Sequence, residues 1–137
     1  FIKNNTEDTF KIISHELIEI LKNNGITATI TGREKTPFSI WRKIQNKKIS
    51  LEQLTDIIGF RVIVKNVEDC YKTLGIFHSR FSTIPGKFKD YISTPKINNY
   101  KSIHTAVIGP KKNRIEIQIR THDMHEFAQR GIASHWK

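Results

Sequence analysis

The segment RIEIQIRT, residues 114–121, alternates strictly between polar side chains and isoleucine as far as residue 120. Because successive side chains of a β-strand point to opposite faces of a sheet, this period of two predicts a strand. One face belongs to the core and carries Ile115, Ile117 and Ile119. The opposite face carries an acid, an amide and two cations, from Arg114, Glu116, Gln118 and Arg120. Such a face either meets solvent or forms one wall of a site.

The preceding segment, YKSIHTAVIG at residues 100–109, alternates in the same way. Tyr100, Ser102 and His104 share one side of it, and the intervening PKKN suits a hairpin turn. Two neighbouring strands would then each display a polar face. If both faces point to the same side of the sheet, they form one continuous polar surface, the floor of a site, rather than only its rim.

Helices and strands alternate along the rest of the chain. DIIGFRVIVK, residues 56–65, is almost continuously apolar, as in a central strand covered on both faces. ITATIT, residues 26–31, is β-branched and predicts another strand. Helical patterns cover residues 6–24, 37–48, 66–81 and 121–134. Residues 82–99 predict a long loop. This order predicts an α/β (α+β) fold, a mixed sheet with helices packed against it.

The bulk properties limit the class of protein. A length of 137 residues suits one domain over residues 1–137, and the missing initial Met predicts a piece of a longer protein. No apolar run approaches the roughly 20 residues of a membrane-spanning helix, so no membrane partner is expected. Cys70 is the single cysteine, which excludes an internal disulfide and favours a cytoplasmic location.

The net charge of +10 comes from 23 Lys and Arg against 13 Asp and Glu. Such an excess attracts polyanions, whether nucleic acid, anionic lipid or nucleotide phosphates. A lysine-rich composition without any such ligand explains the total equally well. The positions of the cations are therefore more informative than their number.

The stretch KDYISTPKINNYKSIHT, residues 89–105, combines a flat ring with amides and cations. This combination of side chains suits the binding of a nucleobase and its phosphates. Tyr100 offers a stacking face, Asn98 can bond a base edge, and lysines neutralise phosphate. Stacking of a base on an aromatic side chain is worth roughly 1–3 kcal/mol in single-strand complexes.

Two acids are candidate metal ligands. Asp56 directly precedes the apolar strand, and Glu116 lies in the alternating one. Mg²⁺ binds proteins through one or two carboxylates together with substrate phosphates, and these two could supply that pair if their strands are adjacent. Asp56 could equally be a turn residue.

The basic segment GREKTPFSIWRK, residues 32–43, lies where a strand turns into a helix. Arginine clamps phosphate with two parallel hydrogen bonds, and lysine acts as a point charge. The segment is not the glycine-rich P-loop. It is either a phosphate-binding segment or a basic surface helix.

Four motifs together carry a resemblance to a known family. GREKTPFSIWRK, LTDIIGFRVIV, GKFKDYISTPKINNYKSIHT and EIQIRTHDMHEFAQRGIASHW have the order and spacing of the RelA/SpoT (p)ppGpp synthetases, over about residues 25–137. The resemblance implies a nucleotidyltransferase-like mixed sheet of about five strands flanked by helices. It also implies a reaction of the stringent response. The pyrophosphoryl group of ATP moves, with Mg²⁺, to the 3′-OH of GDP or GTP, giving ppGpp or pppGpp and AMP.

The resemblance also assigns residues. It implies ATP binding by Arg33, Lys35, Ser39 and Lys43. It implies that Asp56 and Glu116 hold Mg²⁺ and that Glu116 activates the acceptor hydroxyl. The guanosine nucleotide site would comprise Tyr100, Lys96, Asn98, His104, Lys87, Lys89, Gln118 and Arg120.

Three positions depart from the family pattern. Asn99 stands where the family has Gly, Lys87 replaces Arg, and Gln129 replaces Glu. If position 99 requires a positive φ, Asn is the next best tolerated residue after Gly. KFKD, residues 87–90, resembles the basic loop of the bifunctional members of the family. This resemblance implies a preference for GDP as the acceptor.

Two rival functions belong to other classes. One is a regulatory domain that binds guanine nucleotide without transfer, which the departure at Asn99 favours. The other is an RNA-binding module, which the net charge favours, although the lack of an aromatic ladder beyond Tyr100 makes a specific nucleic-acid partner unexpected. Association with the ribosome would depend on parts beyond this chain.

Overall fold

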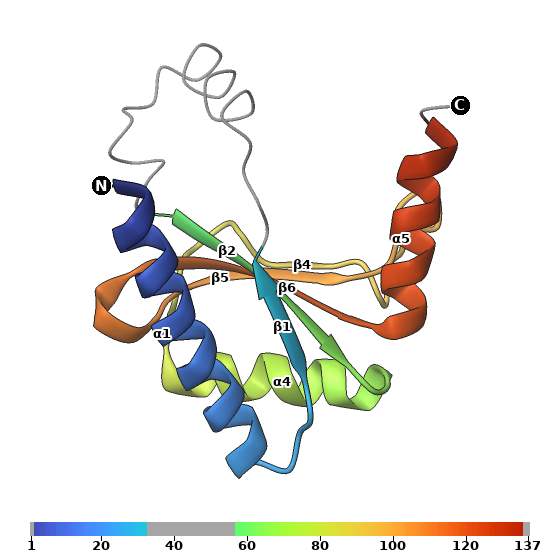
Figure 1. Cartoon of the computed structure of the whole chain (residues 1–137). Helices are drawn as coiled ribbons and strands as arrows, with labels where there is room; N and C mark the ends of the chain where they lie inside the picture. Colours follow the sequence, from blue (N-terminus) through green and yellow to red (C-terminus); the bar gives the residue numbers. More distant parts are fainter. Residues whose placement is uncertain (1, 33–56, 136–137) are drawn as a thin grey trace.

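The computed structural model describes residues 2–32 and 57–135, with the side chains of residues 8–32 and 57–131 (Figure 1). In chain order the described elements are α1 (Ile2–Asn23), β1 (Thr29–Gly32), β2 (Ile57–Val64), α4 (Val67–Arg80), β3 (Ser82–Thr83), β4 (Lys89–Asp90), β5 (Ile103–Ile108), the 3₁₀ turn η1 (Pro110–Lys112), β6 (Arg114–Thr121) and α5 (His122–His135). The fold is α+β, as the sequence predicts.

The described strands form one mixed sheet with β2 and β6 at its centre. Its order is β1-β2-β6-β5-β3, and β4 pairs with β5 beside β3. β2 and β6 are parallel, whereas the other pairs are antiparallel. The sequence patterns predict four strands and the family resemblance about five, and the described sheet has six because the predicted loop at residues 82–99 contributes β3 and β4. Each of these has two residues, too few to leave an alternating pattern in the sequence.

One face of the sheet carries the hydrophobic core. The three isoleucines of β6 are fully buried there, which confirms the predicted alternation. α1 and α4 cover this face (Figure 1). The phenyl rings of Phe10 in α1 and Phe60 in β2 stack with centroids 4.9 Å apart. α4 contributes Phe77 and Cys70, and burial with the neighbouring Asp69 raises the pKa of the Cys70 thiol to about 12.

The two helices that the sequence predicts directly after a strand, α4 and α5, each have a capped start. The Asn66 side chain accepts a hydrogen bond of 2.8 Å from the Asp69 amide at the start of α4. Thr121 accepts one of 3.3 Å from the Met124 amide at the start of α5. α1 begins at Ile2, earlier than the predicted residue 6. None of the described helices is both long and apolar enough to cross a membrane.

Several predictions fall outside the described residues. They are the helix at residues 37–48, the proposed ATP ligands Arg33, Lys35, Ser39 and Lys43, and the acid Asp56.

Candidate functional site

The strand register brings the polar residues of β5 and β6 onto one face, opposite the core. Directly paired residues of neighbouring strands point to the same side of a sheet. The two central rows across β2, β6 and β5 are Gly59–Glu116–Ala106 and Arg61–Gln118–His104. The two predicted polar faces therefore point the same way and form a floor. Gln118 is only 9% exposed and Arg120 3%, so this part of β6 is not a simple solvent-facing strand.

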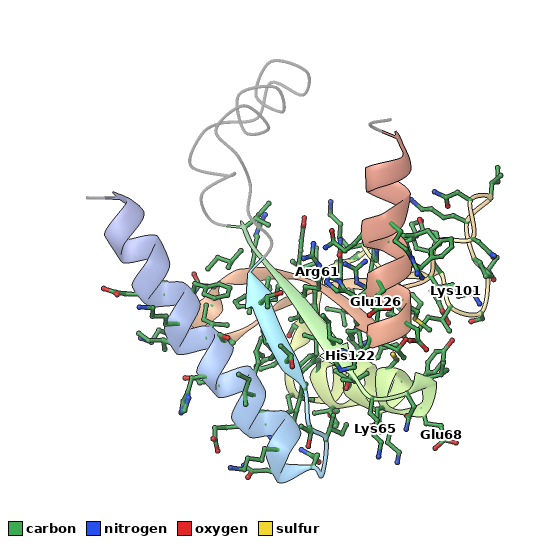
Figure 2. The ribbon with its side chains drawn as sticks, turned by 45° about the vertical axis from the view of Figure 1, so that its right-hand side comes forward. Arg61, Lys65, Glu68, Lys101, His122 and Glu126 are labelled. Carbon is green, nitrogen blue, oxygen red and sulfur yellow. The ribbon has the colours of Figure 1, made fainter. Side chains whose placement is uncertain are left out.

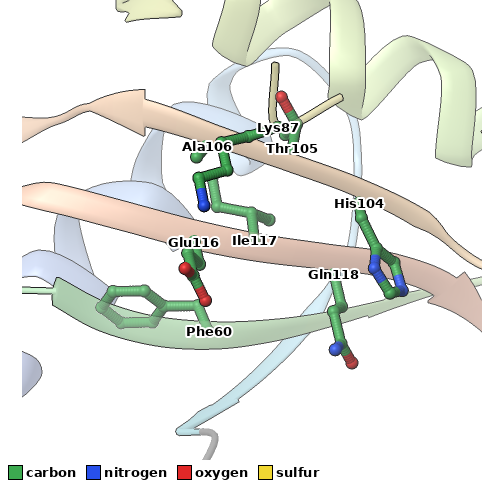
Figure 3. A pocket seen from close by; sticks show the side chains of 8 residues that line it. All are labelled: Phe60, Lys87, His104, Thr105, Ala106, Glu116, Ile117 and Gln118. Atoms are coloured by element: carbon green, nitrogen blue, oxygen red, sulfur yellow. The ribbon is translucent and has the colours of Figure 1, made fainter. Parts of the chain in front are cut away.

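A cavity of about 160 Å³ opens on this floor (Figure 3). Its lining residues are Phe60, Lys87, His104, Thr105, Ala106, Glu116, Ile117 and Gln118. In its row across the sheet, Glu116 stands between Gly59, which has no side chain, and Ala106, which has only a methyl group. The cavity thus brings together four of the predicted site residues, Lys87, His104, Glu116 and Gln118.

An aromatic cluster lies beside this floor. The Tyr100 hydroxyl and Nε2 of His104 are 2.9 Å apart. Tyr91 packs edge-on against both rings, with centroid distances of 6.2 Å to Tyr100 and 5.3 Å to His104. The Lys96 ammonium lies 4.8 Å from the Tyr91 centroid and 5.6 Å from that of Tyr100. Tyr100 is partly exposed rather than packed into the core.

The turn that precedes Tyr100 requires an unusual backbone conformation. Asn99 has φ 67°, in the left-handed region that few residues adopt. Its amide donates to the Lys96 carbonyl at 2.8 Å, and the Asn98 side chain accepts from the Tyr100 amide at 3.2 Å. Asparagine thus occupies a position with a positive φ, and this is the condition under which it can replace the glycine of the family.

The stability of variants at position 99 should therefore depend on how readily the new residue adopts a positive φ. Asn99→Gly should leave the free energy of unfolding nearly unchanged, whereas Asn99→Ala should lower it by about 1 kcal/mol, because alanine adopts a positive φ less readily than glycine or asparagine. Urea unfolding of the two variants measures the difference. Ile97→Ala in the same exposed turn is the control and should behave like the parent chain. Equal stability of the Gly and Ala variants would contradict the argument.

Arg120 lies on the same face but is covered by α5. Its Nη2 is 2.9 Å from Nδ1 of His125. A guanidinium only donates, so this ring nitrogen accepts and carries no proton. Burial, followed by the charges of Arg120 and Arg61, lowers the pKa of His125. Figure 2 shows Arg61 with His122 and Glu126 on the side of the sheet that α5 covers.

The other predicted guanosine ligands lie around the aromatic cluster. Lys89 pairs with His104 across β4 and β5, and therefore faces the same side. The side chains of Lys96 and Asn98 are exposed.

Sequence reasoning missed two residues near this floor. Arg61 occupies the row of Gln118 and His104, and its buried Nε has no hydrogen-bond partner among the described residues. The signal was available, because Arg61 is the one charged residue in the apolar run IIGFRVIV. Tyr91 lies in the segment that was predicted as a loop, so its side chain could not be assigned to a face of the sheet. Recognising β4 would have placed it two residues after Lys89, on the same side.

The described cavity contains one carboxylate, which suits a hard cation only if substrate phosphates supply its other ligands. Glu116 provides the carboxylate of the cavity lining, and carboxylate oxygens are the ligands of Mg²⁺. The described residues contain no group of three His, Cys, Asp or Glu that would form an all-protein metal cage. Mg²⁺ needs no such cage when phosphates complete its shell. β2, which directly follows Asp56 in sequence, is adjacent to β6, and this adjacency is the condition that the pair of acids requires.

The chain is similar to curated proteins of much greater length. It is 54% identical over 123 residues to GTP pyrophosphokinase rsh of Brucella melitensis, covering 90% of this chain and 16% of that protein. It is 51% identical over 134 residues to guanosine-3′,5′-bis(diphosphate) 3′-pyrophosphohydrolase of Aquifex aeolicus, covering 98% and 19%. The chain thus spans less than a fifth of the length of these relatives.

Solved structures of shorter proteins share the fold. Small alarmone synthetase 1 of Bacillus subtilis, bound to its product pppGpp, has TM-score 0.73 and 26% identity, covering 96% of this chain and 78% of that one. Small alarmone synthetase 2 of the same organism has TM-score 0.66 and 30% identity, covering 98% and 75%. The family described as the region found in RelA / SpoT proteins matches residues 32–137. The chain therefore belongs to the RelA/SpoT family.

Proposed function

We propose that this chain is an alarmone synthetase, which transfers pyrophosphate from ATP to the 3′-OH of GDP or GTP and releases AMP. The observation that carries the proposal is the position of Glu116. Its carboxylate lies in a cavity lined also by Lys87, His104 and Gln118, beside the rings of the aromatic cluster. Relatives named GTP pyrophosphokinase and a structural neighbour bound to pppGpp support the same reaction.

Transfer of this kind depends mainly on positioning and on neutralising charge. Tyr100 stacks on guanine, and Lys96 and Asn98 hold its edges. Glu116 accepts or orients the proton of the acceptor hydroxyl. Lys87 and Lys89 neutralise acceptor phosphates, with His104 and Gln118 on the floor beneath them and Arg120 at the edge of the site.

The donor nucleotide would be held by Arg33, Lys35, Ser39 and Lys43. Their chemistry matches phosphate recognition, because arginine forks and lysine point charges bind phosphate oxygens. Glu116 and Asp56 would hold Mg²⁺, which would supply positive charge to offset the negative charge on the phosphates during transfer. The basic loop with Lys87 supports GDP as the preferred acceptor.

Incubating the chain with ATP, GDP and Mg²⁺ tests the proposal, with chromatography of the nucleotides as the measurement. Equal amounts of AMP and ppGpp are expected, and EDTA should stop their formation. ATP with GTP should give pppGpp more slowly. Breakdown of ATP without a guanosine product would contradict the proposal.

A domain that binds guanine nucleotide without transfer is the second candidate, which the asparagine at position 99 favours. It predicts calorimetric GDP binding without AMP release. Binding of RNA, with an affinity that falls steeply with salt and without guanosine chemistry, would instead favour the RNA-binding module. ATP and guanine nucleotides are cytoplasmic metabolites, so a cytoplasmic location is part of the proposal. Association with the ribosome would depend on segments beyond this chain.

A further inference from the structure

The segment KFKD, residues 87–90, presents two chemically different sides. Lys89 pairs with His104 and shares its face, and Lys87 lines the cavity of Glu116. Asp90 pairs with Ile103, whose face carries the core and α4. Phe88 also meets α4, because its ring stands edge-on to His78 with a centroid distance of 6.0 Å. The lysines therefore face the site while the residues between and after them face α4.

The Asp90 carboxylate is occupied by protein donors. Its Oδ1 accepts from the amides of Ile92 at 2.9 Å and Ser93 at 3.0 Å, which fixes the turn after β4. Its Oδ2 accepts from the Ser93 hydroxyl. The Tyr71 hydroxyl of α4 donates to the same carboxylate, at 2.9 Å from Oδ2 and 3.2 Å from Oδ1. The oxygens of Tyr71 and Ser93 are 3.0 Å apart.

At neutral pH an aspartate is ionised and a tyrosine is protonated, and the surroundings move both pKa values further from neutrality. Burial raises the pKa of Asp90, but hydrogen bonds from Ser93, Tyr71 and the turn amides outweigh this and bring it below its ordinary value. The hydrogen bond with Ser93 lowers the pKa of Tyr71, yet partial burial and Asp90 raise it overall. A charged acceptor and a protonated donor form a charge-assisted hydrogen bond, which is stronger than a neutral one.

We infer that Tyr71 is a positioning residue for the acceptor nucleotide, which it serves by fixing Asp90 and through it the segment that carries Lys87 and Lys89. Asp90 itself anchors this segment and does not contact nucleotide or metal. The inference rests on the proposed function, since it concerns the acceptor site of that reaction. It assigns a role in acceptor binding to α4, which packs on the opposite face of the sheet.

Tyr71→Phe removes only the hydroxyl and tests the inference. The KM for GDP should rise several-fold, with about tenfold as the upper bound set by the loss of one charge-assisted hydrogen bond, while kcat and the KM for ATP stay unchanged. Ser79→Ala is the matched control, because it deletes an α4 hydroxyl whose bond to the Ile76 carbonyl is local. It should leave all three constants unchanged. A general loss of structure would instead affect both substrates.

Asp90→Asn and the double variant give a second readout. Tyr71 acts through Asp90, whereas Asp90 also accepts hydrogen bonds from Ile92 and Ser93, so the double variant should raise the KM for GDP no more than Asp90→Asn alone. Additive effects would mean that Tyr71 does not act through Asp90, which overturns the inference. An unchanged KM in Tyr71→Phe would overturn it as well.

Amide hydrogen exchange separates failure of this inference from failure of the proposed function. Exchange at Ile92 and Ser93 should accelerate in Tyr71→Phe without any nucleotide present, and unchanged exchange would overturn the anchor. If the parent chain neither binds GDP nor forms product, the proposed function fails, whatever the exchange result.

Discussion

Replacing Glu116 with glutamine should lower kcat for ppGpp formation at least about a hundredfold, the usual range for loss of a general base. Glutamine keeps the size and shape of the side chain but cannot accept the proton of the acceptor hydroxyl. It is also a poor ligand for Mg²⁺ in place of a carboxylate. Because Glu116 is flanked by Gly59 and Ala106, no neighbouring carboxylate in its row can substitute for it. Initial rates of AMP and ppGpp release measure the loss.

Glu68→Gln is the matched control for Glu116→Gln. Glu68 is exposed in the first turn of α4, so its loss of charge should leave kcat unchanged. Circular dichroism and thermal unfolding of both variants should resemble those of the parent chain. Parental activity in Glu116→Gln would remove the chemical basis of the proposed reaction.

Removing the Tyr100 ring should raise the KM for GDP by about ten- to a hundredfold, which corresponds to the loss of stacking on one base. Tyr100→Ala deletes both the stacking face and the hydroxyl that contacts His104. Tyr100→Phe keeps the ring and should retain most of the affinity. Steady-state kinetics with GDP varied at saturating ATP separates the two variants.

The KM for ATP is the internal control for Tyr100→Ala and should stay unchanged, because the ring is assigned to the acceptor alone. If the Ala and Phe variants raise the KM for GDP equally, the hydroxyl rather than stacking is responsible. If neither raises it, guanine does not bind at Tyr100.

Alternation along β5 and β6 predicted a polar face on each strand but left open whether the two faces point the same way. The period-two pattern identified the buried isoleucines and the opposite row with Glu116, whereas the register of β5 against β6 in the structure shows that the two polar faces point the same way. Helix capping by Asn66 and Thr121 was equally local and was confirmed. These features depend on neighbouring residues in sequence, which is why a single sequence reveals them.

Features set by distant residues were not predictable in the same way. β3 and β4 exist only because β5 offers a paired edge, and neither has a pattern of its own. The contact of Tyr71 with Asp90 spans 19 residues and depends on how α4 crosses the sheet. The covering of Arg120 by α5 likewise follows from tertiary packing rather than from strand periodicity.

The most direct test of the proposed nucleotide site on β5 and β6 is a crystal structure of the chain with GDP, a non-hydrolysable ATP analogue and Mg²⁺. Guanine should lie against Tyr100, and the ribose 3′-oxygen should be about 2.6–3.2 Å from the Glu116 carboxylate, within hydrogen-bond reach. A guanosine bound elsewhere would contradict the account. One such place is the separate cavity of about 460 Å³ between the starts of α4 and α5, lined by Lys65 and Lys101 among others.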